Sequence, residues 1–481
     1  MRRALLLAAL AASIDTFAAA APAAITLPLS SMRPAPPPPA GSEAACGRED
    51  GLPASAIASP NLLGAEDFRA LPCAEIVGGM AQFVLEAQGP GSEDVQPRTL
   101  RAESLDLLEI RVAEMEAVRR LRALGAVGTA SDAALGTLTQ TGEALMGVAT
   151  RPVESVVGFP AGMLRVFGRR AVRYGRQAED LGDEALDAFT DEAGFDVSLR
   201  PVEAEPLPPE PEPWWAQGGG LAMKLGKRWL GYNAARRELG RALGVDPYSS
   251  NPWLSAEMDR LAWSALVGRR TAGFGLGQIG GTAGTVLGRT GRIHRMVWEK
   301  APEEVTAWNA ARLAPLHCVP EAQETFFENS RYGPTLQTQA VDALLELAPQ
   351  SGCERFLALA ASVEREAEAR FVVDVLHLLV AARPRFPTRF EAFGEALGLR
   401  DGEERLFLAL PVDLLQWTPE TAAFFTDPGF KTITDKRVLL GREASPRARD
   451  ALLHRGWALF EQSIGPAREA SSTATPVDPA F

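Results

Sequence analysis

Near the middle of the chain the sequence reads Gly244-Val245-Asp246-Pro247-Tyr248-Ser249-Ser250-Asn251-Pro252. Glycine commonly ends a helix, whereas an asparagine–proline pair is typical of a helix start, because the asparagine side chain caps free N–H groups and proline suits the first turn. We therefore predict a helix over residues 224–243, a tight turn, and a second helix over residues 253–267. Leu254, Leu261 and Ala265 would form the buried side of the second helix.

Helical periodicity also dominates the flanking sequence. Between Leu105 and Leu124 apolar residues recur every three or four positions, with arginine and glutamate on the other side of the predicted helix. Pro160 starts a second amphipathic segment, and the same spacing predicts helices over 341–347, 356–380 and 390–397. No run between residues 60 and 200 alternates apolar and polar residues for long enough to predict a strand.

The pattern changes near the C-terminus. Residues 432–434 and 437–440 have the composition of short strands, Ser445 and Pro446 can begin a helix, and residues 456–460 can form a returning strand. A strand, helix and strand in this order favour parallel pairing. The predicted fold class is therefore mainly α, a multi-helix body with a small βαβ-like element near the C-terminus.

The N-terminus has the three parts of a secretory signal peptide. Arg2 and Arg3 precede a short apolar run, and small residues allow cleavage after Ala20. The apolar run is about half the length that a membrane span needs. Together with an alanine- and arginine-rich composition, which is typical of bacteria, this predicts a periplasmic or secreted protein with a cleaved signal.

Two proline-rich stretches divide the rest of the chain, because proline runs favour extended spacers. The predicted organisation is a signal peptide (1–20), a linker (21–58), an N-terminal helical region (59–205), a linker (206–213), a basic glycine-rich helical region (214–300), a C-terminal mainly helical domain (301–465) and a disordered tail (466–481).

An even number of cysteines in an exported protein predicts disulfides. The four are Cys46, Cys73, Cys318 and Cys353, and three pairings are open. Nearest neighbours, Cys46 with Cys73 and Cys318 with Cys353, form the simplest pairing, and each bond would add about 3–4 kcal/mol. A metal site is the rival interpretation, but the spacing of the cysteines and the scarcity of histidine argue against it.

Charge is unevenly distributed along the chain. The formal net charge of −12 argues against general nucleic-acid binding. Residues 142–176 and 221–300 are nevertheless basic, and residues 177–212 between them are acidic. On the helix after Pro160, one face would carry Arg165, Arg169, Arg173 and Arg176, a pattern suited to an anionic membrane surface. The alternative is that the acidic segment covers the basic ones.

Glycines in the basic region allow two interpretations. Residues 275–280 match the dinucleotide pattern G-x-G-x-x-G, but the pattern requires a preceding strand and the sequence there predicts helix, so no nucleotide cofactor is expected. On a helix, Gly277, Gly280, Gly284 and Gly288 would form part of a small-residue surface for close contact with a membrane or partner. A tightly packed hairpin or a loop inside the fold is the alternative.

One segment resembles a known sequence family. Residues 235–239, the turn at 244–252 and residues 261–263 are similar to a motif in uncharacterised secreted bacterial proteins, and the match spans about thirty of 481 residues. The resemblance implies an exported bacterial protein. It implies no activity and no catalytic residues.

These patterns lead to a binding function. We expect an exported, non-enzymatic envelope protein that binds an unknown protein partner or an anionic membrane surface through the four arginines and the glycines, without cofactor or metal. The alternative is a secreted hydrolase with an unfamiliar site, in which Asp374 would orient His377 three positions later. His317 with Cys318 would offer a thiolate nucleophile only if Cys318 were unpaired.

Overall fold

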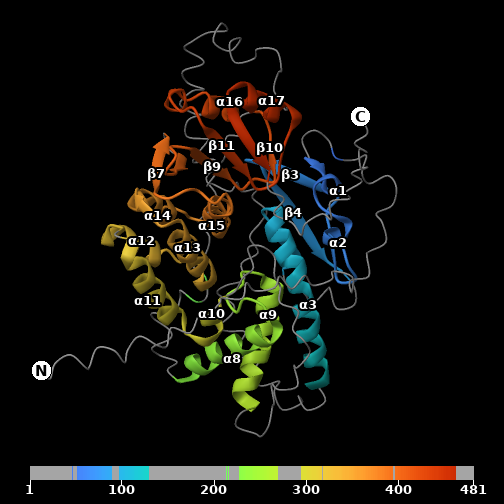
Figure 1. Ribbon diagram of the computed structural model, residues 1–481. Coiled ribbons are helices and arrows are strands. Elements are labelled where there is room, and N and C mark those ends of the chain that lie inside the picture. The colour runs from blue at the N-terminus through green and yellow to red at the C-terminus, as the bar shows by residue number, and fades with distance from the viewer. Residues whose placement is uncertain are drawn as a thin grey trace, which may run out of the picture. The chain divides into compact units, whose positions relative to one another are not determined.

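The computed structural model describes residues 46, 51–88, 97–128, 213, 215, 227–268, 294–316, 318–393 and 396–461. All of them belong to one compact unit of the chain (Figure 1). The predicted signal peptide, the basic helix after Pro160, the glycines at 277–288, His317 and the C-terminal tail lie outside the described residues.

The first part of the described chain is an antiparallel sheet. Its order is β1-β3-β4-β2, with β5 also paired to β4. The strands are β1 (Leu52–Pro53), β2 (Phe68–Ala70), β3 (Cys73–Val77), β4 (Met80–Ala87) and β5 (Thr99–Ala102), with the short helices α1 (Ala54–Ile57) and α2 (Pro60–Leu63) between β1 and β2. Gly78 and Gly79 make the turn from β3 to β4 with positive φ angles of 56° and 83°, a conformation that glycine adopts without strain.

A bundle of three long helices follows, and the first of them packs directly on β4 and β5 (Figure 1). They are α3 (Leu105–Gly128), α8 (Lys227–Leu243) and α9 (Pro252–Gly268). Apolar residues at helical spacing, among them Val112, Leu239 and Leu254, join Phe83 and Leu85 of β4 in one hydrophobic core. The burial of this apolar surface is the main force that holds the helices on the sheet.

A helical layer follows along the chain. It contains α10 (Arg295–Glu299), α11 (Pro302–Leu313), a 3-10 turn at Ala314–Leu316, α12 (Pro320–Glu328), α13 (Pro334–Leu347), α14 (Cys353–Ala361) and α15 (Glu366–Ala381). Helices α11, α12 and α13 each have a proline at their first turn, where the missing N–H has no helical partner to lose. Their apolar residues form a second core with one face of the next sheet.

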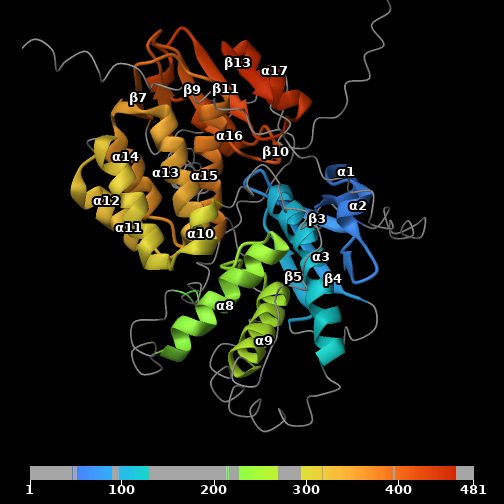
Figure 2. The same cartoon turned by 60° about the horizontal axis from the view of Figure 1, so that its bottom comes forward.

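That sheet is mixed and, within the described chain, has six strands in the order β13-β11-β9-β8-β7-β6. The strands are β6 (Pro349–Ser351), β7 (Thr388–Phe393), β8 (Ala396–Arg400), β9 (Leu406–Leu410), β11 (Lys436–Leu440) and β13 (Trp457–Glu461). Strand β9 is buried throughout because helices cover both faces, α15 on one and α16 (Pro419–Phe425) with α17 (Pro446–His454) on the other (Figure 2). A short parallel pair, β10 (Leu414–Leu415) with β12 (Glu443–Ala444), lies beside them.

The prediction of a mainly α fold is wrong. The described region is 52% helical and 21% strand, with several multi-stranded sheets. The sequence offered little period-two signal because β1, β2 and β5 have only two to four residues each. Alternation is visible only in a longer strand. In this first sheet β4 is long enough to show it, because Phe83 and Leu85 alternate with Gln82 and Glu86 along the strand.

Local predictions in the C-terminal half had mixed outcomes. The helix predicted over 390–397 is instead the β7–β8 hairpin, because Phe390 and Phe393 have helical spacing but stack on Phe356 and Phe430, in two different cores. Residues 432–434 form no strand. The βαβ-like element is confirmed: β11, α17 and β13 follow one another, and β11 and β13 pair in parallel. The structure also places β1 and α1 within residues 51–58, the end of the predicted linker.

Both nearest-neighbour disulfides are present. Cys46–Cys73 joins the start of the described chain to β3, with a Cα–Cα distance of 5.7 Å, and Cys318–Cys353 joins the loop before α12 to the start of α14, at 5.4 Å. Two disulfides indicate an oxidising compartment, either periplasmic or extracellular. In the ranges that the structure covers, no helix has the length and apolarity to cross a membrane.

Candidate functional site

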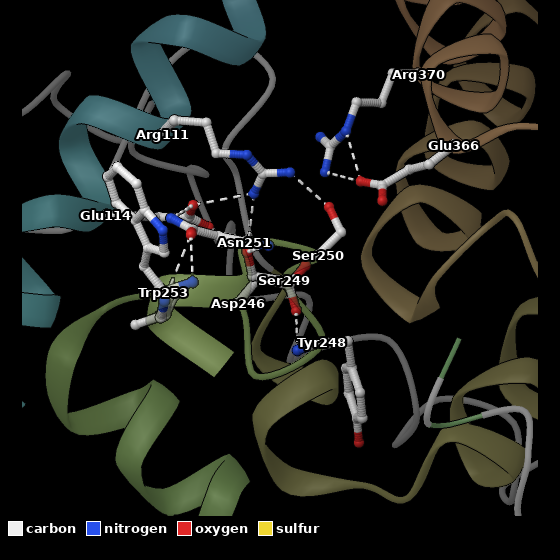
Figure 3. A network of polar contacts seen from close by, with 11 residues as sticks. Arg111, Glu114, Asp246, Tyr248, Ser249, Ser250, Asn251, Trp253, Glu366 and Arg370 are labelled. Atoms are coloured by element: carbon white, nitrogen blue, oxygen red, sulfur yellow. Dashed lines mark hydrogen bonds and ion pairs between the residues drawn. The ribbon is translucent and has the colours of Figure 1, made fainter. Parts of the chain in front are cut away.

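The turn at residues 244–252 lies at the centre of a buried polar network (Figure 3). The turn connects α8 to α9 and contacts charged side chains of α3. On its other side it reaches Glu366 of α15, which accepts a hydrogen bond from Ser250. Four elements that are far apart in the sequence therefore meet at this turn.

Local sequence fixes the shape of the turn. Gly244 ends α8 with a φ of 69°, the left-handed conformation expected for a helix C-terminus. Asp246 accepts a hydrogen bond from the N–H of Tyr248 at 2.8 Å. The predicted cap of α9 is confirmed, because Asn251 Oδ1 accepts hydrogen bonds from the N–H groups of Trp253 and Leu254 at 3.0 and 3.4 Å.

Two charged residues of α3 bind the turn. Arg111 Nη1 contacts Glu114 Oε2 at 3.1 Å, and its side chain also donates to Ser249 and Ser250. Glu114 accepts from the Ser249 hydroxyl at 2.5 Å and from the Asn251 amide at 2.9 Å. Both side chains of this ion pair are at most 5% exposed. A buried carboxylate is tolerable here because a guanidinium, a hydroxyl and an amide all bind it.

A second ion pair faces the first from α15. Arg370 donates twice to Glu366 Oε1, at 2.6 and 2.9 Å. Although burial opposes it, the nearby Arg370 and Arg111 hold the pKa of Glu366 below its usual range. Two arginines therefore pair with two glutamates around the turn, and burial raises the pKa of Asp246 beside them.

Arg236 of α8 also binds the turn at 244–252, through its guanidinium group. It is 1% exposed, and its guanidinium donates to the Pro247 carbonyl at 3.3 and 3.1 Å and to the Ser255 hydroxyl at 3.2 Å. It also forms an ion pair with Asp259 of α9. Burial lowers the pKa of Arg236. Arg236 thus ties α8 to both the turn and α9.

An aromatic contact connects Trp215 to Tyr248 of the turn. Trp215 lies two residues after the second proline-rich stretch, and its ring meets Tyr248 edge to face at a centroid distance of 6.0 Å. A side chain at Gly333 would contact the same Trp215 ring at 3.5 Å. Burial raises the pKa of Tyr248 to about 12, so this ring is a neutral packing partner. The contact fixes where residue 215 lies relative to α8 and α9.

The network sets the orientation of α3 and α9. Near the turn Arg111 meets Ser250, and farther along the helices Arg122 meets Glu257 at 3.1 Å and Arg260 meets the Leu121 carbonyl at 3.2 Å. The two helices therefore run in parallel and end at the same end of the bundle, which we call the distal end, defined by Gly128 and Gly268. Residues 129–212 continue from α3 there, and residues 269–293 continue from α9.

The predicted site residues differ in where they lie. Arg165, Arg169, Arg173, Arg176, Gly277, Gly280, Gly284 and Gly288 all belong to the two segments that begin at the distal end, and their role stays a prediction. Cys318 is in the predicted disulfide, which excludes the alternative in which an unpaired Cys318 would act as a nucleophile with His317.

The Asp374 and His377 pair forms a contact but not an evident catalytic arrangement. His377 Nδ1 lies 3.6 Å from Asp374 Oδ1, and the histidine side chain is 35% exposed. Asp374, but not His377, lines a small cavity between α3, α13 and α15, which has room for about one water molecule. Within the described ranges no group of three potential ligands could hold a metal ion.

Sequence reasoning missed Arg111, Glu114, Arg236 and Ser249. The arginines and glutamates of residues 105–124 were assigned to the polar side of a helix, yet Arg111 and Glu114 are buried because the turn covers them. The available signal was the number of hydrogen-bonding side chains in residues 246–251. A solvent-exposed turn needs few of them, whereas a buried turn must satisfy every polar group.

Comparison with protein families, curated proteins and solved structures finds no match to this chain. The resemblance of residues 235–263 to secreted bacterial proteins therefore stays a prediction. In the structure those residues are α8, the turn and α9, so the resembling motif coincides with the polar network.

Proposed function

We propose that the chain is an exported, non-enzymatic envelope protein that binds through the two segments starting at the distal end of the helical bundle. The observation that supports this proposal is their common origin. Residues 129–212, with the predicted arginine face, and residues 269–293, with the glycines, begin at the ends of the parallel helices α3 and α9. Two segments whose starting points are more than a hundred positions apart in sequence can therefore act on one ligand.

The surface near the distal end supports a binding role. Trp263 lies in the last turns of α9 and is 41% exposed, although its ring contacts Tyr232 at a centroid distance of 4.9 Å. A partly exposed tryptophan suits membrane interfaces and protein interfaces, where one edge is apolar and the other is wet. The two disulfides indicate an oxidising compartment, and an envelope protein works in such a compartment.

An anionic membrane surface is the ligand to test first. The experiment is cosedimentation of the full mature chain with vesicles of anionic lipid, compared with vesicles of zwitterionic lipid. We expect binding to the anionic vesicles that weakens with salt, because charges are screened over about 10 Å at 0.1 M. The triple substitution Arg165→Glu, Arg169→Glu and Arg173→Glu should abolish it.

A matched control keeps the same change in net charge. Arg295, Arg385 and Arg449 are 79%, 68% and 43% exposed and lie outside both segments. Replacing these three by glutamate should leave most of the binding. If both triple variants bind equally well, or if the unaltered chain does not bind, the membrane ligand is rejected. A protein partner then becomes the target of cross-linking at residue 263.

Export itself is tested at the N-terminus. We propose cleavage after Ala20, so mass spectrometry of protein from the native cell should find a first residue between 19 and 25. An intact Met1 on the mature protein would contradict the signal peptide.

The hydrolase alternative is less well supported. It rests on Asp374 and His377, whose separation of 3.6 Å is longer than a good hydrogen bond. Asp374 also lines the small cavity that Asp106 lines, and His377 is not among the residues that line it. The geometry therefore favours the binding function.

A further inference from the structure

A single buried carboxylate joins the N-terminal sheet, α3 and the C-terminal sheet. Asp413 lies between β9 and β10, and its side chain is 3% exposed. Its Oδ2 accepts the Ala81 N–H of β4 at 2.8 Å and the Leu105 N–H of α3 at 3.0 Å. In return, the N–H groups of Asp413 and Leu414 donate to the Gly79 carbonyl at 2.9 and 3.0 Å. These residues are more than three hundred positions apart in sequence, so Asp413 maintains a long-range contact.

The same place holds an excess of acidic groups. We call it the acidic joint, and it consists of Asp106 and Glu109 of α3, Asp374 of α15, Asp413, and Arg442 from the β11–β12 turn. Arg442 Nη2 contacts Asp106 at 2.9 Å and Glu109 at 2.8 Å, and its Nε lies 3.9 Å from Asp413. All five side chains are at most 22% exposed.

Other charged groups nearby do not neutralise this excess of negative charge. Arg370 of α15 also lines the cavity between Asp106 and Asp374, but it is bound to Glu366. Arg365 is paired with Glu103 at 2.9 Å, just before α3. His377 lies 3.6 Å from Asp374 and is the remaining titratable group in contact with the joint among the described residues. Asp106, Glu109 and Asp413 therefore share the guanidinium of Arg442, and Asp374 adds negative charge beside Asp106.

Such an arrangement favours protonated carboxyls. Burial raises the pKa of Asp413 to about 6, even though two N–H groups and Arg442 act in the opposite direction. Burial and the neighbouring Asp374 raise the pKa of Asp106 well above its usual range, and Arg442 opposes this. A buried carboxyl with a raised pKa holds its proton more tightly in the folded joint than in the opened one.

We propose that the acidic joint is a proton-dependent latch between the N-terminal part of the chain, β4 with α3, and the C-terminal sheet. A proton on Asp413 Oδ1 leaves Oδ2 free to accept both N–H groups, so the latch keeps its hydrogen bonds and loses a buried charge. When the proton leaves to solvent, the added negative charge near Asp106 and Glu109 weakens the joint. The latch is therefore strongest in mild acid and weakest above about pH 6.

The experiment is hydrogen–deuterium exchange of the full chain at pH 5 and pH 7.5, with rates corrected for intrinsic exchange. A carboxyl with a pKa of about 6 in the closed joint and 3.8 in the opened one predicts about tenfold faster exchange at pH 7.5. The increase should appear in peptides from β4 and from the first turns of α3, which contain the amides of Ala81 and Leu105.

Asp413→Asn should remove most of this pH difference, because the amide oxygen can still accept both N–H groups but carries no charge. Asp401→Asn is the matched control. Asp401 has no exposed side-chain area, but Arg405 and three backbone N–H groups hold its pKa below the usual range. Its substitution should alter the β8–β9 turn and leave the pH difference in β4 and α3 intact.

Two outcomes would overturn the latch. One is equal corrected exchange of β4 and α3 at both pH values, and the other is a full pH difference in Asp413→Asn. If Asp413→Asn does not fold, Glu109→Gln replaces it, since Glu109 adds negative charge beside both Asp413 and Asp106 and takes part in no backbone hydrogen bond of the joint. It should reduce the tenfold difference, and an unchanged difference would again reject the proposal.

Discussion

Helix α3 takes part in two buried polar contacts that differ in their charge balance. Arg111 and Glu114 meet the turn at 244–252 and the Glu366–Arg370 pair, where each of the two glutamates has its own arginine partner. One to two turns earlier, Asp106 and Glu109 belong to the acidic joint, where they share Arg442 with Asp413. The comparison shows that burial alone does not decide how a charged group behaves. Although burial opposes it, Arg370 and Arg111 hold the pKa of Glu366 below its usual range, whereas burial raises the pKa values of Asp106 and Asp413 in the acidic joint.

The largest loss of stability should come from breaking the polar network around the turn at 244–252. Glu114→Ala removes the partner of Arg111, Ser249 and Asn251 and leaves a buried guanidinium without its carboxylate. We expect a loss of about 3–5 kcal/mol in the free energy of unfolding, the usual cost of removing one partner of a buried ion pair. Denaturant unfolding followed by circular dichroism measures it.

Glu116→Ala is the control for that prediction. Glu116 lies one half-turn farther along α3, is 49% exposed and pairs with Arg119 and Arg120 at the surface. Surface ion pairs contribute less than about 1 kcal/mol. Similar losses in the two variants would show that Glu114 is not the centre of a buried network.

A smaller effect, which depends on pH, should follow the loss of the cation in the acidic joint. Arg442→Met removes the contacts to Asp106 and Glu109 and the charge that lowers the pKa values of Asp106 and Asp413, so these two pKa values should rise further. Raised carboxyl pKa values stabilise the fold in acid and destabilise it at higher pH. We expect a loss of about 2–3 kcal/mol at pH 7.5 and clearly less at pH 5.

Unfolding curves at the two pH values test this, with Arg449→Met as the control. Arg449 pairs with Glu461 at the surface, and both groups are partly exposed. Its loss should cost less than about 1 kcal/mol at either pH. A loss for Arg442→Met that is the same at pH 5 and pH 7.5 would contradict the charge imbalance of the joint.

The smallest effect should come from the cap of α9. Asn251→Ala removes the acceptor of two helix N–H groups and one donor to Glu114, for an expected loss of about 1–2 kcal/mol. Asn251→Ser keeps a capping oxygen and should lose less. Neither side chain titrates, so thermal unfolding should show the same differences at pH 5 and pH 7.5.

Local sequence was sufficient where one segment contains the whole signal. Gly244, Asn251 and Pro252 predicted the end of α8 and the start of α9, and the spacing of apolar residues predicted α3. The strands of the first sheet could not be predicted in this way. Phe68–Ala70 is only three residues long, and it is a strand because β4 supplies its hydrogen-bond partners.

The candidate site likewise has some features that the sequence predicts and others that only the structure shows. The sequence by itself determined the helix boundaries around residues 244–252, because they depend on residues close together in the chain, whereas the export signal stays a prediction. Only the tertiary structure decided that Arg111 and Glu114 are buried, that α3 and α9 run in the same direction, and that Asp413 meets Ala81 and Leu105. The physical reason is that burial and charge balance are set by neighbours in space, and those neighbours come from distant parts of the sequence.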